Sequence, residues 1–277
     1  MSSSGMLIQH EPARFGLVIV GDEILSGKRE DKHLSKIIEL LRARGLQLAW
    51  AHYAGDDRDA LIELYRRTFA GTDIVFSCGG IGATPDDHTR QAAAAALDLP
   101  LQLHPEASAL ISQRCAEMAL KGNGSADMST PENLQRLKMG DFPVGAVIIP
   151  NPFNRIPGFS LRDHWFVPGF PVMAWPMIEW VLDTHYANHF NTQSRVERSM
   201  IVFEIAESLL TPLMEDVERK FPGVRSFSLP SVGDGQDGKP ARRHVELGVR
   251  GAEESVIGIA FGELRAGVLA LGAEVGA

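Results

Sequence analysis

Apolar runs that would be buried as strands alternate with amphipathic stretches along the N-terminal part of the chain. The run Phe15–Val20 holds only apolar residues and glycine, and two further runs of strand type follow it. Between them, apolar side chains recur every three or four positions, as they do on one face of a helix. The pattern predicts strands at 15–20, 46–53 and 73–77, and helices at 31–44, 57–70 and 90–97. Strands alternating with helices indicate an α/β fold, a three-layer α/β/α arrangement around a mostly parallel sheet.

The remaining pattern predicts more elements of the same domain and then a second, smaller domain. Helices are expected at 105–120, from 129–132 onward and at 172–185, and short strands at 147–149 and 165–167, each leading into a proline-bearing turn. The later segments 198–205, 211–221, 224–229, 242–249 and 253–271 follow the order β-α-β-β-α, and the glycine run Gly233–Gly238 would connect a hairpin. We therefore expect a disordered lead-in (1–13), a large α/β domain (14–190) and a small α+β domain (191–277).

Acidic residues follow the first three predicted strands. Gly21-Asp22-Glu23 comes after the first strand, Gly55-Asp56-Asp57 after the second, and Asp86-Asp87 shortly after the third. Ligands of parallel α/β sheets bind at the carboxyl ends of the strands, so these acids should share one functional rim. Each acid taken alone is also a common turn or helix-capping residue.

A glycine-rich turn joins the third strand to its helix. Gly79, Gly80 and Gly82 stand in the run Cys78–Thr89, which also carries Thr84, Asp86 and Asp87. Such a turn exposes backbone N–H groups that cradle phosphate. Its spacing matches neither the nucleotide-triphosphate loop nor the dinucleotide fingerprint. The alternative is a tight turn without a ligand, in which Asp86 or Asp87 caps the helix.

Phosphate and carboxylates in one turn imply a cation between them. A phosphate about 4 Å from a single carboxylate meets a repulsion of about 4 kcal/mol at an effective dielectric constant near 20. We therefore predict a divalent metal ion, Mg²⁺ above all, between the phosphate and the carboxylates of Asp86 and Asp87.

Composition and charge narrow the choice of partner. The formal net charge of −8 opposes binding to nucleic acid or to an anionic membrane, which favours a small-molecule ligand. The first residues lack the features of a secretory leader, and no apolar run has the roughly 20 residues of a membrane span. With only Cys78 and Cys115 present, we expect a cytoplasmic protein with reduced thiols, in which Cys78 is a packing residue.

Four motifs in this order carry a family resemblance. They are Gly21–Gly27, Gly79–Thr89, the pair Asn151-Pro152 with Pro157-Gly158-Phe159, and Pro168-Gly169-Phe170-Pro171. Together they resemble the MoaB/Mog molybdopterin-binding domain over residues 14 to 185. Order and spacing are most similar to the N-terminal half of the competence/damage-inducible CinA family and to the domain that precedes the synthase module of eukaryotic FAD synthases.

The resemblance implies a pterin or a dinucleotide pyrophosphate bound across these loops. In the CinA and FAD-synthase branches it implies metal-dependent (Mg²⁺ or Co²⁺) hydrolysis of ADP-ribose or FAD, and in the adenylyltransferases the acids corresponding to Asp56 and Asp87 are needed for chemistry. The hypothesis that the resemblance supports is metal-assisted hydrolysis of a nucleotide pyrophosphate, with Asp87 and Asp56 as catalytic residues. The cation would be held by Asp87 together with Asp22 or Asp56, and backbone amides near residues 80–84 would hold one phosphate. Related domains commonly form homo-oligomers, and the second domain resembles a KH-like domain. The implied ligand-binding residues are Gly21, Asp22, Glu23, Gly79, Gly80, Gly82, Thr84, Asp86, Thr89, Asn151, Gly158, Pro168, Gly169 and Pro171.

Two other functions stay open. The rim would also suit a module that binds molybdopterin without turning it over, or an enzyme that adenylylates molybdopterin. Asp22 stands where CinA sequences usually carry threonine, and Ala83 where proline is common, so the substrate is less well indicated than the fold. Nucleic-acid binding by the second domain is not expected, because Glu204 and Glu207 flank the junction where a KH module carries a Gly-x-x-Gly loop.

Overall fold

The computed structural model describes residues 13–192, 196–232 and 242–276, and it divides into two compact units between Phe190 and Asn191. The predicted lead-in, apart from residue 13, and the Gly233–Gly238 connection lie outside the described residues. Each unit is described by itself. None of the helices in the described ranges is long and apolar enough to cross a membrane.

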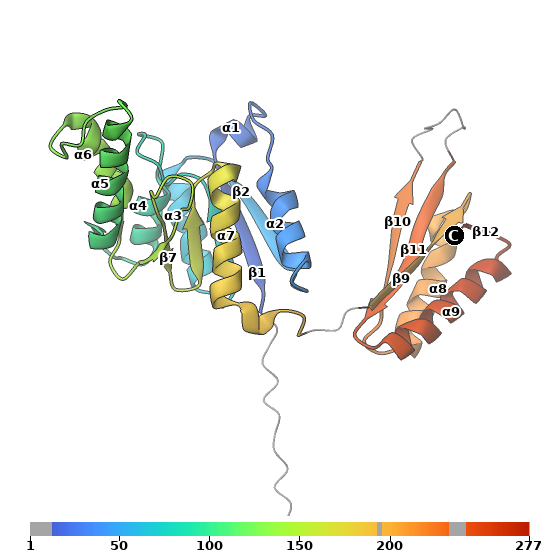
Figure 1. Ribbon diagram of the computed structural model, residues 1–277. Coiled ribbons are helices and arrows are strands. Elements are labelled where there is room, and N and C mark those ends of the chain that lie inside the picture. Colours follow the sequence, from blue (N-terminus) through green and yellow to red (C-terminus); the bar gives the residue numbers. More distant parts are fainter. Residues whose placement is uncertain (1–12, 193–195, 233–241, 277) are drawn as a thin grey trace, which may run out of the picture. The chain divides into compact units, whose positions relative to one another are not determined.

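The first unit is built on a six-stranded sheet with the order β2-β1-β3-β8-β7-β6 (Figure 1). The strands are β1 (Phe15–Val20), β2 (Leu48–Ala54), β3 (Ile74–Cys78), β6 (Val147–Ile149), β7 (Gly158–Leu161) and β8 (His164–Val167). Neighbouring strands pair in parallel from β2 to β8, and β7 pairs antiparallel with both β8 and β6. Five strands therefore run in one direction and β7 alone is reversed, so the mostly parallel sheet is confirmed and the hairpin strand β7 was missed.

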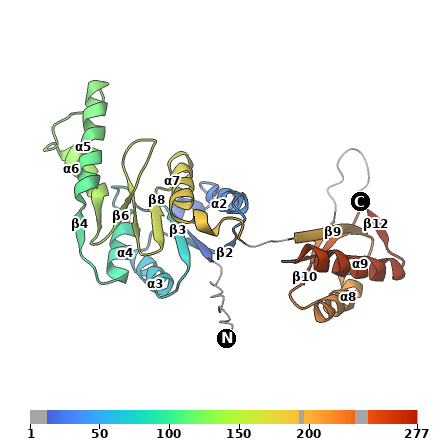
Figure 2. The same ribbon diagram turned by 60° about the horizontal axis from the view of Figure 1, so that its bottom comes forward.

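Helices cover both faces of this sheet (Figure 2). They are α1 (Asp22–Leu25), α2 (His33–Arg42), α3 (Arg58–Phe69), α4 (Thr89–Ala96), α5 (Pro105–Leu120), α6 (Pro131–Leu137) and α7 (Pro171–His185), with short 3-10 turns η1 (Lys138–Gly140) and η2 (Ala187–His189). Phe15, Leu17 and Ile19 of β1 pack with α2 and α7, whereas Val18 and Val20 pack with α3 and α4. Alternate residues of a strand point to opposite faces, so the apolar run of β1 is buried on both sides.

An excursion between α4 and β6 forms one end of the first unit. It contains the short antiparallel pair β4 (Leu101–Leu103) and β5 (Asp141–Pro143), together with α5, α6 and η1. Proline occupies the first turn of α5 and α6, where its missing N–H costs no helix hydrogen bond, and Thr130 caps α6 through the N–H of Asn133. We call residues 121–140 the arm.

The second unit is a four-stranded antiparallel sheet with two helices. Its strands are β9 (Val196–Phe203), β10 (Arg225–Ser231), β11 (His244–Gly251) and β12 (Glu274–Gly276), in the order β10-β11-β9-β12, and its helices are α8 (Glu207–Lys220) and α9 (Glu254–Ala270). One cluster of buried residues joins both helices to the sheet. The predicted order β-α-β-β-α is confirmed, with β12 added after it, and the finer KH-like resemblance is not shown by this arrangement.

Candidate functional site

A cavity of about 570 Å³ opens where the strands of the first unit end. Its walls come from the segments that follow β1, β2, β3, β6 and β8, the five strands that share one direction. These strand ends lie at the edge of the sheet beside α1 in Figure 1. Among the residues named from the sequence, those lining the cavity are Gly21, Glu23, Asp56, Gly79, Gly80, Gly82, Thr84, Asp86, Asp87, Asn151, Pro168 and Gly169.

The glycine turn is anchored to the protein through its carbonyl groups. The hydroxyl of Thr89 donates to the carbonyl of Gly79 at 3.0 Å, and the N–H of Thr89 donates to the carbonyl of Gly80 at 3.0 Å. The guanidinium of Arg90 donates to the carbonyl of Gly82. In a trans peptide the following N–H points away from the carbonyl, so the N–H groups of Gly80, Ile81 and Ala83 are directed away from these anchors. No hydrogen bond of the described residues uses these three donors, which makes the turn suited to an anion.

Glycine is required in this turn for conformation and for space. Gly79 and Gly80 have φ angles of +107° and +68°, which side-chain-bearing residues rarely adopt. A Cβ on Gly79 would lie 2.3 Å from the backbone oxygen of Val20. Gly169 completes the packing, because a Cβ there would approach the Cα of Gly79 to 3.3 Å. The Pro168–Pro171 loop therefore packs directly against the turn.

Four of the residues implied to bind ligand do not line this cavity. Thr89 is fully buried beneath the turn and Gly158 is buried in β7, where a Cβ would lie 2.4 Å from the carbonyl oxygen of Phe166. Asp22 lies beside the cavity and holds Asp56, and Pro171 lines a neighbouring cavity of about 310 Å³. The structure thus gives Thr89 and Gly158 packing positions that shape the turn and the sheet.

Asp87 closes the turn rather than capping α4. One of its carboxylate oxygens accepts hydrogen bonds from the N–H of Thr84 at 2.9 Å and from the Thr84 hydroxyl at 2.5 Å. The residue at the N-cap of α4 is His88, and no side chain caps that helix. The capping alternative for Asp86 or Asp87 is therefore wrong. One of the amides expected to hold phosphate, that of Thr84, is also already occupied.

Asp22 and Asp56 link the ends of β1 and β2 by a reciprocal pair of hydrogen bonds. The N–H of Asp22 donates to the carboxylate of Asp56 at 2.9 Å, and the N–H of Asp56 donates to that of Asp22 at 3.2 Å. Partial burial raises the pKa of Asp56, and the negative charges of Asp22, Glu23 and Asp86 raise it further, while the hydrogen bond from Asp22 opposes the shift. The acids of three strand ends are thus close enough to repel one another. Asp57 stands apart as the N-cap of α3.

The fit of a metal ion depends on these carboxylates. Within the described ranges, no three or more His, Cys, Asp or Glu side chains are grouped so as to hold a metal ion. Mg²⁺ nevertheless needs only one or two carboxylates when water and phosphate oxygens complete its octahedron. The repelling oxygen donors around Asp56 have the hard character that such a cation prefers.

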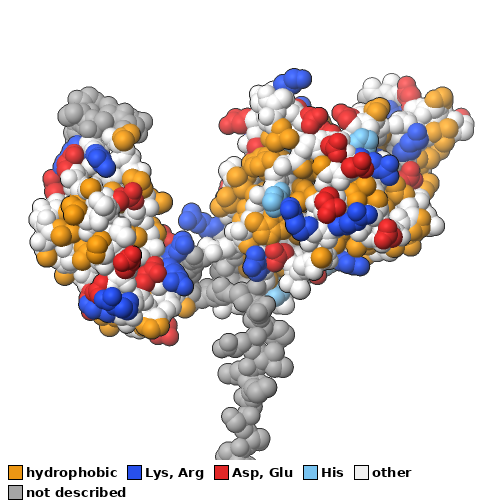
Figure 3. All heavy atoms as spheres, turned by 180° about the vertical axis from the view of Figure 1, so that it is seen from behind, with side chains coloured by type: hydrophobic (Ala, Val, Ile, Leu, Met, Phe, Trp, Pro, Cys, Tyr) orange, Lys and Arg blue, Asp and Glu red, His pale blue; other side chains and the backbone are white. Residues whose placement is uncertain are grey.

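Positive charge is scarce around the cavity. Arg29 is the one Lys or Arg among the described residues that line it, and its guanidinium lies 5.7 Å from the ring centre of Phe170 and 3.8 Å from the carboxylate of Glu23. Arg155 turns away and pairs with Glu117 at 2.8 Å. On the face shown in Figure 3, Lys and Arg are interspersed with Asp and Glu and form no extended basic patch in either unit.

Asn151 organises the loop that follows β6. Its side-chain amide donates to the side chain of Asn154 and to the carbonyl of Ile156, both at 2.9 Å, and its oxygen accepts from the N–H of Phe153 at 3.0 Å. Asn151 is only 5% exposed. Asn151 therefore has a conformational role in this loop.

The contacts that Arg90 and His33 make at the site were not predicted from the sequence. Arg90 is 3% exposed and lies under the glycine turn. His33, in the first turn of α2, is within hydrogen-bond distance of the carbonyl of Gly169, at 2.9 Å from its Nε2. Both residues lie in helices that were predicted only from the spacing of their apolar side chains. Arg90 reaches the glycine turn, and His33 reaches the Pro168–Pro171 loop, only in the folded chain.

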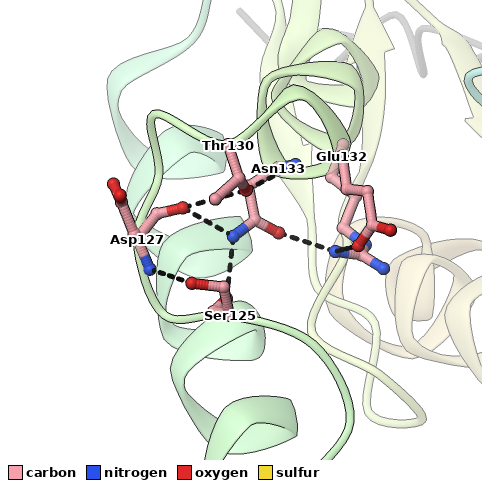
Figure 4. Close-up of polar contacts among 6 residues, drawn as sticks. Ser125, Asp127, Thr130, Glu132 and Asn133 are labelled. Atoms are coloured by element: carbon pink, nitrogen blue, oxygen red, sulfur yellow. Dashed lines mark hydrogen bonds and ion pairs between the residues drawn. The ribbon is translucent and has the colours of Figure 1, made fainter.

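The arm contributes Met139 to the lining of the cavity, and its residues are joined to one another by hydrogen bonds. Asn133 is fully buried, and its side-chain amide donates to the carbonyls of Ser125 and Asp127 at 2.8 and 2.9 Å (Figure 4). Its oxygen accepts from Arg136 at 2.6 Å. From this arm Met139 lines the cavity, and the side chain of Gln135 donates to the carbonyl of Ala83 in the glycine turn.

Comparison with known proteins agrees with this architecture. Residues 16–187 match the family described as "Probable molybdopterin binding domain". The chain therefore belongs to the molybdopterin-binding domain family.

Individual relatives point to the CinA-like branch. The chain is 31% identical over 281 residues to a CinA-like protein of Anaeromyxobacter sp., covering 94% of this chain and 64% of that protein. It is 32% identical to a CinA-like protein of Desulforapulum autotrophicum, covering 76% of this chain and 49% of that protein. A crystal structure of the protein CinA from Thermoplasma acidophilum, described as of unknown function, is similar with a TM-score of 0.52 and 26% identity, covering 61% of this chain and 97% of the other.

Both CinA-like relatives are longer than the part that the chain matches. It spans between about half and about two thirds of their length. The resemblance to the CinA family that the four motifs carried is thereby confirmed.

Proposed function

We propose that the first unit is a metal-dependent nucleotide pyrophosphatase that acts on ADP-ribose, FAD or a similar dinucleotide. The observation that carries this proposal is that one cavity is lined both by the carboxylates of Glu23, Asp56, Asp86 and Asp87 and by three backbone N–H groups that no hydrogen bond of the described residues uses. A site that only bound an anion would be expected to carry Lys or Arg in place of these acids. A hydrolase uses acids of this kind to hold a cation and to accept a proton.

Each group of the site then has a role. The N–H groups of Gly80, Ile81 and Ala83 hold the oxygens of one phosphate and stabilise the charge that develops on them. Asp22 and Asp87 hold a divalent cation, which when bound would neutralise charge on the pyrophosphate. Asp56 orients a water molecule and accepts its proton, a task favoured by its raised pKa.

The products follow from the bond that is broken. Water adds to phosphorus as the bridging P–O bond breaks, and the leaving phosphate takes the bonding electron pair. ADP-ribose would give AMP and ribose phosphate. The cavity's volume of about 570 Å³ lies in the range of sites that enclose ligands of this size.

A molybdopterin-binding module is the second candidate. It is favoured by the family match and by the apolar part of the wall, where Ile81, Met139 and Met173 offer flat contact to a ring system. Adenylylation of molybdopterin remains a variant of this candidate that would consume ATP and release pyrophosphate. We further propose that the protein works as a cytoplasmic homo-oligomer.

The test is AMP release from ADP-ribose, FAD and NAD with Mg²⁺, Mn²⁺, Co²⁺ or EDTA, followed by chromatography. We expect metal-dependent release that falls at least about 100-fold in the Asp87→Ala and Asp87→Asn proteins. Asp87→Asn retains the oxygen that accepts the Thr84 bonds, so it separates loss of charge from loss of the turn. Asp57→Ala is the matched control, because it removes a helix cap one residue from Asp56.

Unchanged turnover in Asp87→Asn would remove Asp87 from the mechanism. AMP release that persists in EDTA would remove the metal ion. If none of the three dinucleotides is hydrolysed, the pyrophosphatase is refuted and the binding module becomes the better description, which direct titration with a pterin would then test.

A further inference from the structure

Asn123 stands near the start of the arm, in the loop that ends α5. The N–H of Gly122 donates to the carbonyl of Ala119 at 2.9 Å. The N–H of Asn123 donates to the carbonyl of Met118, also at 2.9 Å. With a φ of +76° at Gly122, these two bonds form a Schellman motif. The motif fixes the backbone as far as the N–H of Asn123 and no further.

The peptide group after Asn123 is exposed and unanchored. Within the described residues, neither the side-chain amide of Asn123 nor the N–H of Gly124 makes a hydrogen bond. Gly124 has a φ of +93° and no Cβ that would hinder its own nitrogen. Asn123 is also the one asparagine of the sequence that precedes a glycine. Its side-chain carbonyl is therefore open to the backbone nitrogen of Gly124.

The other asparagines of the first unit lack this combination. Three of them engage their side-chain amides in hydrogen bonds, namely Asn133, Asn151 and Asn154. Asn188 is exposed, but the following N–H, that of His189, donates to the carbonyl of Tyr186 at 2.9 Å. Asn188 thus provides a matched comparison within the same chain.

An exposed amide beside a free glycine nitrogen has the requirements of intramolecular deamidation. The deprotonated nitrogen of Gly124 attacks the side-chain carbonyl carbon of Asn123, ammonia leaves with the proton that the nitrogen lost, and a five-membered succinimide ring forms. Water then opens either carbonyl of the ring. Asparagine and water are thereby converted to ammonia and either aspartate or isoaspartate. Isoaspartate leads the main chain through the former side chain, which adds one methylene group to the backbone.

We propose that Asn123 is a site of spontaneous deamidation, and that the isoaspartate formed there loosens the arm. The added methylene lies just ahead of Ser125, whose carbonyl accepts the buried side-chain amide of Asn133 at 2.8 Å (Figure 4). The new carboxylate arises close to Arg136, because a Cβ on Gly124 would lie 3.9 Å from its Nη1. Arg136 donates to the side-chain oxygen of Asn133 at 2.6 Å, so both changes act on the same buried amide. The inference goes beyond the proposed function and does not depend on it.

Site-resolved peptide mass spectrometry of the full chain, incubated at pH 7, pH 8 and pH 9, tests this assignment. We expect aspartate and isoaspartate at residue 123, and no comparable conversion at Asn188. The rate should rise about tenfold for each unit of pH, because the attacking nitrogen must be deprotonated. Asn123→Gln should abolish the conversion without loss of folding, since the side chain is exposed and makes no hydrogen bond within the described residues.

Hydrogen exchange of the same samples tests the effect on the arm. The arm of the incubated protein should exchange faster than that of Asn123→Asp, which gains the negative charge without the added methylene. The arm of the incubated Asn123→Gln protein should exchange as slowly as that of the fresh protein. A faster exchange in incubated Asn123→Gln would overturn the role of isoaspartate, and so would equal exchange in the incubated protein and Asn123→Asp.

Two results would overturn the modification site itself. One is an intact Asn123 in the folded protein while the unfolded chain converts at this residue, because the loop would then protect the amide. The other is conversion of Asn188 as fast as that of Asn123, because the free glycine nitrogen would then have no effect. Neither result bears on AMP release from dinucleotides, which tests the proposed function separately.

Discussion

Replacing Asp56 by Asn should make the protein more stable and less active at the same time. Partial burial raises the pKa of Asp56, and the negative charges of Asp22, Glu23 and Asp86 raise it further. A raised pKa means that folding disfavours the charged form, so at pH 7 this charge destabilises the folded state. Asn keeps an oxygen to accept the bond from the N–H of Asp22, which is 2.9 Å in length, and removes the charge.

Partial exposure to water limits the magnitude of this effect. Screening reduces the repulsion to roughly 1 kcal/mol or less. A change of about 1 kcal/mol moves the melting temperature of a unit of this size by roughly 2 to 4 °C. The gain should shrink as the pH falls through the pKa of Asp56 in the folded state, because the carboxyl group of the unaltered protein is then neutral too.

Tryptophan fluorescence is suited to measuring this effect, because all four tryptophans lie in the first unit. Melting of the Asp56→Asn protein is compared with that of Asp57→Ala, which loses the hydrogen bond that the N–H of Ala60 donates to the side chain of Asp57 and should be less stable by about 1 kcal/mol. AMP release is measured on the same samples. An Asp56→Asn protein that melts lower than the unaltered protein, or that keeps full turnover, would refute the reasoning.

Three further predictions concern stability and conformation. Burial lowers the pKa of His164 to about 3 from an ordinary value of 6.5, so the unfolded chain takes up the proton first as the pH falls. The free energy of unfolding should therefore drop by about 2 kcal/mol between pH 7 and pH 5. In denaturant titrations, His164→Gln should remove most of that drop. Gly79→Ala places a Cβ 2.3 Å from the Val20 oxygen, and should cost about 2 kcal/mol or more in the same titrations; an unchanged midpoint would contradict the turn geometry. Asn133→Ala leaves two carbonyls and Arg136 without their partner, and should speed hydrogen exchange in the arm while the exchange of β1 stays slow.

Local patterns in the sequence were enough to predict the layers of the first unit. Apolar runs and apolar residues at helical spacing predicted β1, β2, β3 and the helices between them to within a few residues. This works because the side chains buried by a strand or a helix recur at fixed spacings along the sequence. The turn at Gly79 and Gly80 was also predicted from the sequence, since only glycine adopts their backbone angles at low cost. The strand β7 was missed because it has only four residues, too few to show a periodic spacing of apolar side chains.

Contacts between residues that are distant in the sequence depend on how the whole chain folds. Asp22 and Asp56 are 34 positions apart and meet because β1 pairs with β2. Arg90 and Lys138 are 48 positions apart, and the burial of that arginine depends on where the arm returns to the turn. Local periodicity and turn preference alone placed β1, β2, β3 and the helices between them, and put acids and glycines at the ends of these strands. Which acid closes the turn, which amides remain free and which charge lies beneath them depend on chain segments that only folding brings together.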